Sequence, residues 1–377
     1  MVKKMKQIPL AKPDITNREI EYVADVLKSG ILSIGPKVAK FEEMIAQYVG
    51  VKHAIAVNSG TSGLHLIVRA MGIGEGDEVI TTPFSFVASS NCILMEGARP
   101  VFVDIDKNTL NIDIDKIEEK ITDKTKAILA VDVFGHPVDM ERINAIAEKH
   151  NLKVIEDSCE ALGSEFKGIK CGKNCDAGVF AFYPNKQITT AEGGIIVTDD
   201  DTLADLCRSM RSQGRAITGT WLYHERLGYN YRLSELHAAL GIAQMERIDE
   251  ILERRTRVAE LYNNLLRDVT GVSIPYISPD VTTMSWFVYV IRLDKGIDRD
   301  RVMEELQIRG IGCKPYFTPI NHQPFYKEYL SPDTDLSAND DISERTIAIP
   351  FFTTMTEEEV IYVVDNLKDI LYRMKNM

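Results

Sequence analysis

One lysine stands out as a candidate for covalent chemistry. Lys186 follows a Phe/Ala-rich segment that Pro184 ends, and a glycine pair, Gly193 and Gly194, begins the next apolar segment. A lysine that is partly removed from water can have a lowered pKa and act as a Schiff-base nucleophile and proton carrier. The ordinary alternative is a solvated loop lysine, and for Lys186 taken alone that alternative is the stronger one.

A carboxyl group follows a second apolar segment. Residues 154–157 read Val-Ile-Glu-Asp, so Asp157 ends a buried type of strand. A carboxylate in such a poorly hydrated place needs a cationic partner. A metal-binding or helix-capping role for Asp157 is equally consistent with the sequence.

A third segment, residues 58–64, has the composition of an anion-binding turn. It reads Asn-Ser-Gly-Thr-Ser-Gly-Leu and joins an expected strand to an expected helix. Small residues let backbone N–H groups converge on an anion, and the helix dipole and the hydroxyls of Thr61 and Ser62 favour phosphate. The segment matches no standard nucleotide-binding loop, so a simple tight turn is an equal alternative.

The order of the three segments is more informative than any one of them. A phosphate-type turn comes first, Asp157 ends a later strand, and Lys186 follows Asp157 by 29 residues. Together they supply the contacts that pyridoxal phosphate (PLP) requires. The sequence therefore predicts a PLP site.

The elements that must position these side chains alternate between strand and helix. Such alternation predicts a mostly parallel sheet flanked by helices, with ligands bound at the carboxyl ends of the strands. Strands are expected at 53–57, 78–82, 100–104, 127–133, 153–157, 178–183 and 194–198. Helices are expected at 62–71, 86–95, 140–150 with Asp139 as its cap, and 234–265 as one long connecting helix.

The pattern changes after Val269 to strand, helix, strand, helix, at 285–293, 298–309, 311–316 and 357–374. We therefore expect an α/β fold in two parts. The first is a large cofactor-binding domain over residues 1–265 with a seven-stranded, mostly parallel sheet, and the second is a small α+β domain over residues 266–377. Residues 1–30 could pack on either domain.

Composition excludes several classes of protein. The 377 residues are 45% hydrophobic, enough for a substantial core, so the chain is neither disordered nor fibrous. A formal charge of −12 opposes binding to nucleic acids and anionic membranes. No apolar stretch approaches the roughly 18 residues of a membrane span, and the first residues lack the apolar core of a signal peptide, so we expect a cytoplasmic protein.

The six cysteines are too few for a disulfide scaffold in a chain of this size. Cys171 and Cys175 could provide two metal ligands, but no further Cys or His lies nearby at ligand spacing. We therefore expect no metal site.

Taken together, the sequence blocks resemble the DegT/DnrJ/StrS family of PLP-dependent sugar aminotransferases, which have the type I fold. The likeness extends over nearly the whole chain. The matching blocks lie at 32–36, 58–61, 76–80, 82–86, 97–104, 156–157, 186, 192–194 and 227–232.

The resemblance implies a role for each motif. Lys186 would bind the cofactor covalently, Asp157 would keep its pyridine nitrogen protonated, and Phe86 would stack on its ring. Gly60 and Thr61 would bind its phosphate. By the same resemblance Asn230 would reach the phosphate in the neighbouring subunit, which implies a homodimer with shared active sites.

The chain departs from the family pattern at two positions. Ala181 replaces a serine that usually bonds the phosphate, so one contact is missing or is supplied by Ser62 or water. Glu160 replaces a common glutamine beside the ring oxygen of the cofactor. An ionised carboxylate would be repelled there, so we expect Glu160 to be protonated or reoriented when the cofactor is bound.

The family resemblance also implies a ping-pong transamination. Glutamate would donate the amino group, and a nucleotide-linked keto-sugar would accept it to give an amino-sugar nucleotide for polysaccharide or glycoconjugate synthesis. Arg215 and Lys314 are candidates for contacting the diphosphate, and His322 for contacting the sugar. Each of these three residues is equally consistent with a surface or packing role.

Three alternatives remain open. The same motifs suit an aminotransferase that makes a cyclitol amine or an aminobenzoate precursor. Related dehydratases carry histidine in place of the lysine, so Lys186 argues against them. A non-enzymatic regulator that binds a small molecule on the same fold is the alternative from a different class.

Overall fold

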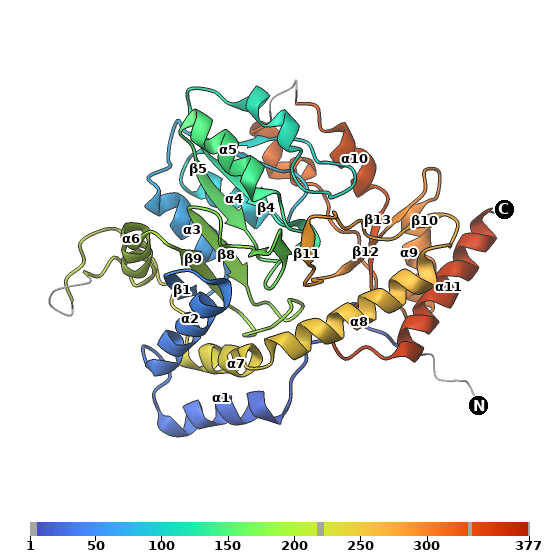
Figure 1. The fold of residues 1–377 in the computed structure, drawn as a ribbon, viewed down its shortest axis with the longest axis horizontal. Helices are drawn as coiled ribbons and strands as arrows, with labels where there is room; N and C mark the ends of the chain where they lie inside the picture. Colours follow the sequence, from blue (N-terminus) through green and yellow to red (C-terminus); the bar gives the residue numbers. More distant parts are fainter. Residues whose placement is uncertain (1–5, 217–221, 331–333, 376–377) are drawn as a thin grey trace.

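A seven-stranded sheet forms the centre of the molecule (Figure 1). The computed structural model describes residues 6–216, 222–330 and 334–375. In sheet order the strands are β1 (His53–Val57), β9 (Gly194–Thr198), β8 (Ala177–Ala181), β5 (Lys153–Asp157), β4 (Thr125–Val131), β2 (Glu78–Thr81) and β3 (Arg99–Phe102). Only β9 runs antiparallel to its neighbours, β1 and β8. The predicted seven-stranded, mostly parallel sheet is confirmed.

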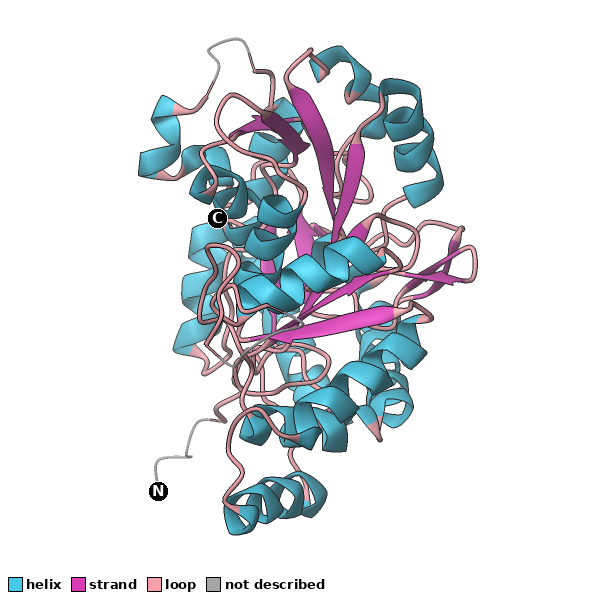
Figure 2. Ribbon diagram, turned by 90° about the vertical axis from the view of Figure 1, so that its left-hand side faces the viewer, coloured by secondary structure: helices cyan, strands magenta, loops and turns pink. Residues whose placement is uncertain are grey.

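Helices cover both faces of this sheet (Figure 2). One face packs against α3 (Gly60–Ala70), α4 (Ala88–Met95) and α6 (Asp201–Arg211). The other packs against α2 (Pro36–Val49), α5 (Met140–His150) and α7 (Glu235–Met245). Side chains alternate between the two faces along each strand. In β5, for example, Val154 packs on the α5 side and Ile155 packs on the α3 side.

Two helix starts show how local sequence sets the boundaries. Asp139 caps α5 as predicted, because its side chain accepts a hydrogen bond from the N–H of Arg142 at 3.1 Å. Ser59 caps α3 in the same way through the N–H of Ser62. The helix expected from residue 86 begins later, at Ala88, so Phe86 lies in the turn that precedes it.

The single helix expected over 234–265 is wrong. It is divided into α7 and α8 (Ile248–Leu266), with Arg247 at the break. The guanidinium of Arg247 forms ion pairs with Asp14 and Glu19 in the N-terminal part of the chain. These partners lie far away in the sequence, so helical periodicity carries no sign of the break.

The C-terminal part has its own antiparallel sheet, in the order β10 (Val272–Ser273), β12 (Tyr289–Leu293) and β13 (Thr346–Ile349). The helices α9 (Arg299–Ile308) and α11 (Glu357–Lys375) pack on it. The strand expected at 311–316 is wrong, because Ile311 and Lys314 form only isolated bridges, to Ile8 and Ala348.

The helix α8 joins the two parts (Figure 1). Its first turns pack with the core beneath the large sheet through Ile248 and Ile251, whereas Tyr262 and Leu266 belong to the C-terminal core. The N-terminal segment also contacts both parts. Ile8 pairs with Ile311, while α1 (Asn17–Ser29) is tied to the α7–α8 junction by ion pairs. The domain boundary after residue 265 stays a prediction.

The remaining elements are short. A second three-stranded sheet contains β11 (Val281–Thr283), β6 (Glu165–Phe166) and β7 (Ile169–Lys170), and α10 (Ser337–Ser343) precedes β13. No helix within the described residues combines the length and the apolar character that crossing a membrane requires.

Candidate active site

The carboxyl ends of β5 and β8 and the first turn of α3 meet at a cavity of about 490 Å³. Residues from distant parts of the chain line it, and the C-terminal part contributes Phe287, Tyr316 and Phe317. The cavity brings together six of the residues predicted from sequence: Gly60, Thr61, Phe86, Asp157, Glu160 and Lys186.

Strand alternation at the end of β5 sends its two carboxyl groups to opposite faces. Asp157 lies on the α4 side and lines the cavity, whereas Glu156 lies on the α5 side. Oδ2 of Asp157 accepts a hydrogen bond from the Ser89 hydroxyl at 2.7 Å, and Oδ1 accepts one from the N–H of Cys159 at 3.2 Å. Both donors are neutral, so this buried carboxylate can still pair with a cationic group of a ligand.

Lys186 is largely removed from water, in contrast to the solvated loop lysine that its local sequence alone favours. Its side chain is 13% exposed, and Nζ lies 3.4 Å from Oε1 of Glu160. Nζ also lies 3.9 Å from the centre of the Phe287 ring. The amine therefore faces the cavity between a carboxyl group and an aromatic ring.

Glu160 is the second acid of the cavity. Its Oε2 accepts a hydrogen bond from the N–H of Phe134 at 2.9 Å. Burial raises the pKa of Glu160, although the nearby ammonium of Lys186 and the N–H of Phe134 oppose that rise. The geometry thus favours a carboxyl group that takes up a proton more readily than an exposed glutamate.

The start of α3 forms the other end of the cavity. The first N–H groups of a helix have no acceptor within the helix, so those of Gly60 and Thr61 suit an anion. A side chain at Gly60 would place its Cβ 2.9 Å from the Cβ of Ala181, which explains the glycine. Likewise, a Cβ at Gly194 would lie 2.5 Å from the carbonyl of Ser59, so Gly194 allows β9 to approach this turn.

Ser62 is not placed to replace the serine that is missing at position 181. Its hydroxyl donates to Oδ1 of Asn58 at 2.6 Å, and it does not line the described walls of the cavity. The hydroxyl-bearing residues of this turn that do line the cavity are Ser59 and Thr61.

Four other predicted residues are absent from the described walls of this cavity. Asn230 and Lys314 are exposed. Nε2 of His322 lies 3.0 Å from Oδ1 of Asp340, and Nε of Arg215 is buried with no hydrogen-bond partner among the described residues. Their roles in binding remain predictions.

Several residues that line the cavity were not predicted from the sequence. Ser89 follows Phe86 by three residues, and in the helix expected over 86–95 that spacing would place both on one face. Asn185 precedes Lys186 and also lines the cavity, as does Tyr183. Tyr316, Phe317 and Phe287 come from the C-terminal part, and no local signal in the sequence connects them with Lys186.

Comparison with known proteins adds to this geometry. The family model of the DegT/DnrJ/EryC1/StrS aminotransferases matches residues 13–368. The chain belongs to this family. The resemblance inferred from the motifs is thereby confirmed.

Individual relatives are similar to this chain over almost their whole length. A GDP-perosamine synthase from Escherichia coli O157:H7 is 38% identical over 366 residues, covering 97% of this chain and 99% of that protein. The structure of Helicobacter pylori PseC, an aminotransferase involved in the biosynthesis of pseudoaminic acid, is 31% identical with a TM-score of 0.92, and the match covers 98% and 100% of the two chains. Spr1654 of Streptococcus pneumoniae in its PLP form is 29% identical with a TM-score of 0.92, covering 98% and 99%.

As a member of this family the chain is a PLP-dependent aminotransferase. The residues present suit that cofactor. The open start of α3 suits the phosphate, buried Asp157 suits a cationic ring nitrogen, and Lys186 offers an amine in the same cavity.

Proposed function

We propose that this enzyme transfers an amino group from glutamate to a nucleotide-linked keto-sugar. The product would be an amino-sugar nucleotide, a precursor of a polysaccharide or another glycoconjugate. The observation that carries this proposal is the end-to-end similarity to a GDP-perosamine synthase, in a chain whose cavity brings Lys186 and Asp157 together. For the same reason a GDP-linked sugar is the first acceptor to test.

Different residues of the cavity would bind different parts of the cofactor. Gly60 and Thr61 would hold its phosphate, Phe86 would contact its ring, and Asp157 would pair with its ring nitrogen. When bound, PLP supplies an electron sink that stabilises negative charge at the substrate carbon. The hydroxyl of Ser89 holds Asp157 in place for this pairing.

Lys186 is the proton carrier in this proposal. Its amine faces the cavity, and Glu160 and Phe287 limit its freedom on two sides. In the first half-reaction a lysine in this position can take the proton from the α-carbon of the donor. In the second half-reaction it can give a proton to the sugar carbon that receives the amino group. Phe287, Tyr316 and Phe317 line the cavity with aromatic surface, which helps to exclude water.

We propose further that the enzyme acts as a homodimer. Two large side chains that line the cavity, Phe86 and Tyr183, are 61% and 53% exposed. Exposed apolar side chains also occur on α1 and in the segment that follows it, at Ile20, Leu27 and Ile34. A second subunit would cover these residues. In such a dimer Asn230 of one subunit would reach the cofactor phosphate in the other.

We place the reaction in the cytoplasm, whose reducing conditions keep thiols unpaired. The six cysteines are free thiols in the structure. The contacts of Arg215 and Lys314 with the diphosphate and of His322 with the sugar remain part of the proposal.

The substrate can be tested with a panel of acceptors. The holoenzyme is incubated with glutamate and nucleotide-linked keto-sugars, including a GDP-linked one, and the products are analysed by mass spectrometry. We expect an amino-sugar nucleotide from at least one of them. Amination of a cyclitol ketone or an aminobenzoate precursor, with none of the nucleotide sugars converted, would overturn the proposal.

A further inference from the structure

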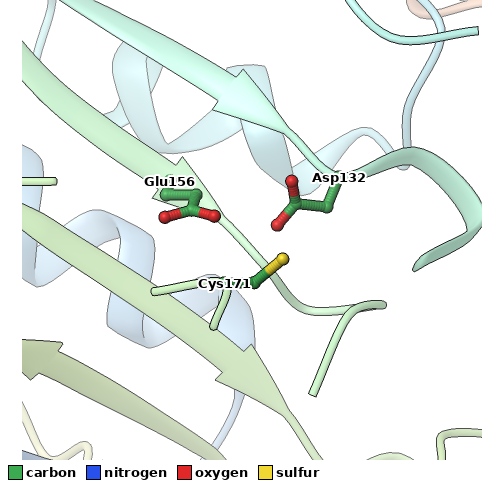
Figure 3. Close-up of side chains that lie close together, drawn as sticks. All are labelled: Asp132, Glu156 and Cys171. Atoms are coloured by element: carbon green, nitrogen blue, oxygen red, sulfur yellow. The ribbon is translucent and has the colours of Figure 1, made fainter. Parts of the chain in front are cut away.

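A second cluster of reactive side chains lies across β5 from the active site. Figure 3 shows Asp132, Glu156 and Cys171 pointing toward one another. Asp132 follows β4, Glu156 belongs to β5 and Cys171 follows β7. All three are buried, and their candidate ligand atoms lie within 4.8 Å of one another. None of them takes part in the proposed transamination.

Each carboxyl group has one oxygen held by the backbone and one oxygen without a partner. Oδ1 of Asp132 accepts a hydrogen bond from the N–H of Val138 at 2.9 Å, and Oε2 of Glu156 accepts one from the N–H of Gly172 at 2.9 Å. The other two oxygens, Oδ2 of Asp132 and Oε1 of Glu156, are buried and meet no donor of good hydrogen-bond geometry among the described residues. This arrangement orients one free oxygen of each group, as outer hydrogen bonds do at metal sites.

A fourth side chain adds an independent observation. Ser158 is fully buried, and its Oγ makes no hydrogen bond of good geometry with any described residue. It faces the carboxyl groups of both Asp132 and Glu156. The thiol of Cys175 faces Glu156 from the far end of the turn that begins at Cys171. Oxygen and sulfur atoms therefore converge here.

We propose that Asp132, Glu156 and Cys171 bind one divalent cation of the zinc class, with Ser158 or Cys175 available as a fourth ligand. A divalent cation would offset most of the negative charge of two carboxylates and a thiolate, in a place where unpaired charge is costly. A zinc ion bonds oxygen at ~2.0–2.2 Å and sulfur at ~2.3 Å, so it can bridge ligand atoms at these separations. The thiolate favours zinc over magnesium or calcium, which prefer oxygen ligands alone.

The cluster is connected to solvent, and it lies where two strands end. A small hollow of about 40 Å³ is lined by Glu156 and Cys171 together with Lys167, Ile169 and Asn174 nearer the surface. A cation here would join the ends of β4 and β5 to the 171–175 turn. It would thus fix the strand end that carries Asp157.

The proposal also explains why the sequence predicts no metal at Cys171 and Cys175. That expectation rested on the lack of ligands nearby along the chain. The missing ligands come from Asp132 and Glu156, which only the parallel pairing of β4 with β5 brings close.

The test measures metal binding directly. The full-length protein is stripped with a chelator, dialysed against Zn²⁺ and analysed by elemental mass spectrometry. We expect about one Zn²⁺ per chain and a higher melting temperature with Zn²⁺ than with chelator. Co²⁺ in place of Zn²⁺ should give a thiolate-to-metal absorption band.

Variants locate the site. D132N and C171S should each weaken Zn²⁺ binding by more than about 100-fold, because even outer partners of a metal are worth roughly 10–100-fold. C207S is the matched control, since Cys207 is equally buried but lies outside the cluster, and it should bind Zn²⁺ like the wild type.

Zn²⁺ binding by the wild type tests the proposal even if a variant fails to fold. No Zn²⁺ uptake and no effect of Zn²⁺ or chelator on the melting temperature would overturn the proposal, and the two carboxyl groups would then share a proton instead. Equal binding by D132N, C171S and the wild type would place the metal elsewhere and overturn the assignment.

Discussion

The Nζ atom of Lys186 lies 3.4 Å from Oε1 of Glu160, in a cavity that Asp157 also lines. Two buried acids therefore lie near one amine. Glu160 is the one that pairs with the amine, while neutral donors, among them the Ser89 hydroxyl, hold Asp157. Because Glu160 pairs with the amine, Asp157 is left free to pair with the cationic ring nitrogen of the cofactor. The same pairing keeps Lys186 within the cavity.

Replacing Lys186 should stop transamination. Lys186 supplies the only amine among the described residues that line the cavity, so K186A loses the residue that we propose as the proton carrier. We expect the rate to fall by at least about 10³-fold, within the range of general acid–base effects. K173A is the control, because Lys173 pairs with Asp199 at the surface and should leave the rate unchanged. Measurable turnover by folded K186A would contradict the assignment.

Replacing Ser89 should leave the carboxylate of Asp157 less well oriented and so weaken PLP binding. S89A removes the hydrogen bond to Oδ2, and a hydrogen bond to a charged group is worth about 1.5–3 kcal/mol. We expect PLP affinity, measured by titration of the cofactor-free protein, to fall roughly 10–100-fold.

The next residue provides the control for S89A. Ser90 is also buried in α4, but its hydroxyl lies 2.6 Å from that of Tyr326. S90A should therefore keep its PLP affinity. Equal affinities for S89A and S90A would show that the Ser89 bond does not support Asp157.

Local sequence was sufficient to predict the sheet and six of the residues that line the cavity. Apolar runs marked β5 and β8, and strand alternation separates Asp157 from Glu156 once β5 is known. Contacts between residues far apart in the sequence cannot be recognised from the local pattern of residues. The break at Arg247 depends on Asp14 and Glu19, and the wall formed by Tyr316 depends on how the C-terminal part packs.

Glu160 should make stability depend on pH in a defined direction. Burial raises its pKa above the ordinary value of 4.5, so the folded state binds a proton more tightly than the unfolded state. The stability that this proton provides is present below pH 4.5 and is lost as the pH rises through the raised pKa.

The variant E160Q isolates this effect because glutamine does not titrate. As the pH rises from 4.5 through the raised pKa, the cofactor-free wild type should lose stability relative to E160Q. Denaturant unfolding of both proteins across this range measures the difference. A constant difference would show that Glu160 has the same pKa in both states.

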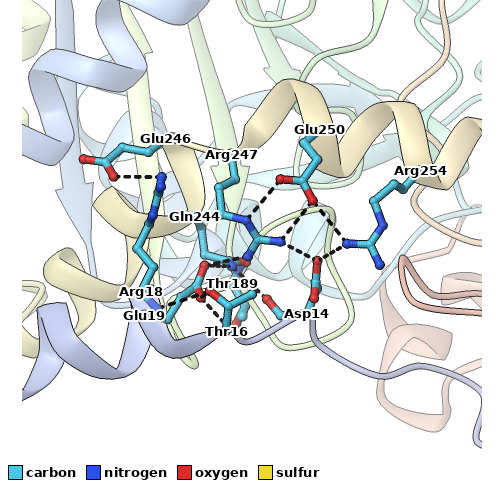
Figure 4. A network of polar contacts seen from close by, with 10 residues as sticks. All are labelled: Asp14, Thr16, Arg18, Glu19, Thr189, Gln244, Glu246, Arg247, Glu250 and Arg254. Atoms are coloured by element: carbon cyan, nitrogen blue, oxygen red, sulfur yellow. Dashed lines mark hydrogen bonds and ion pairs between the residues drawn. The ribbon is translucent and has the colours of Figure 1, made fainter.

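The network in Figure 4 should stabilise the attachment of α1. Arg247 pairs with Asp14 and with Glu19, each at 2.9 Å, and Glu19 is 1% exposed. R247Q leaves these acids without that cation, which should cost about 3–5 kcal/mol of unfolding free energy.

The more exposed Arg254 provides the comparison. It also contacts Asp14, but it is 33% exposed and Arg247 remains beside the same acid. R254Q should therefore cost only about 0–1 kcal/mol. Urea unfolding measures both values, and equal costs would show that burial of the Arg247 network does not matter.

Acid should weaken the same network. Burial alone would oppose ionisation of Glu19, but hydrogen bonds from Thr16 and Gln244 outweigh it and lower the pKa of Glu19 to about 2. This carboxylate therefore contributes stability above pH 4.5 that is lost as the pH falls toward about 2. An E19Q variant should lack this part of the acid transition.

The most direct test of the account follows the nitrogen atom itself. The holoenzyme is given glutamate labelled with a heavy nitrogen isotope and a GDP-linked keto-sugar, and the nucleotide sugar is then weighed by mass spectrometry. The account predicts that the label appears in an amino-sugar nucleotide with the wild type and not with K186A. Folded, PLP-loaded wild type that transfers no label to this sugar or to any other nucleotide-linked keto-sugar would contradict it.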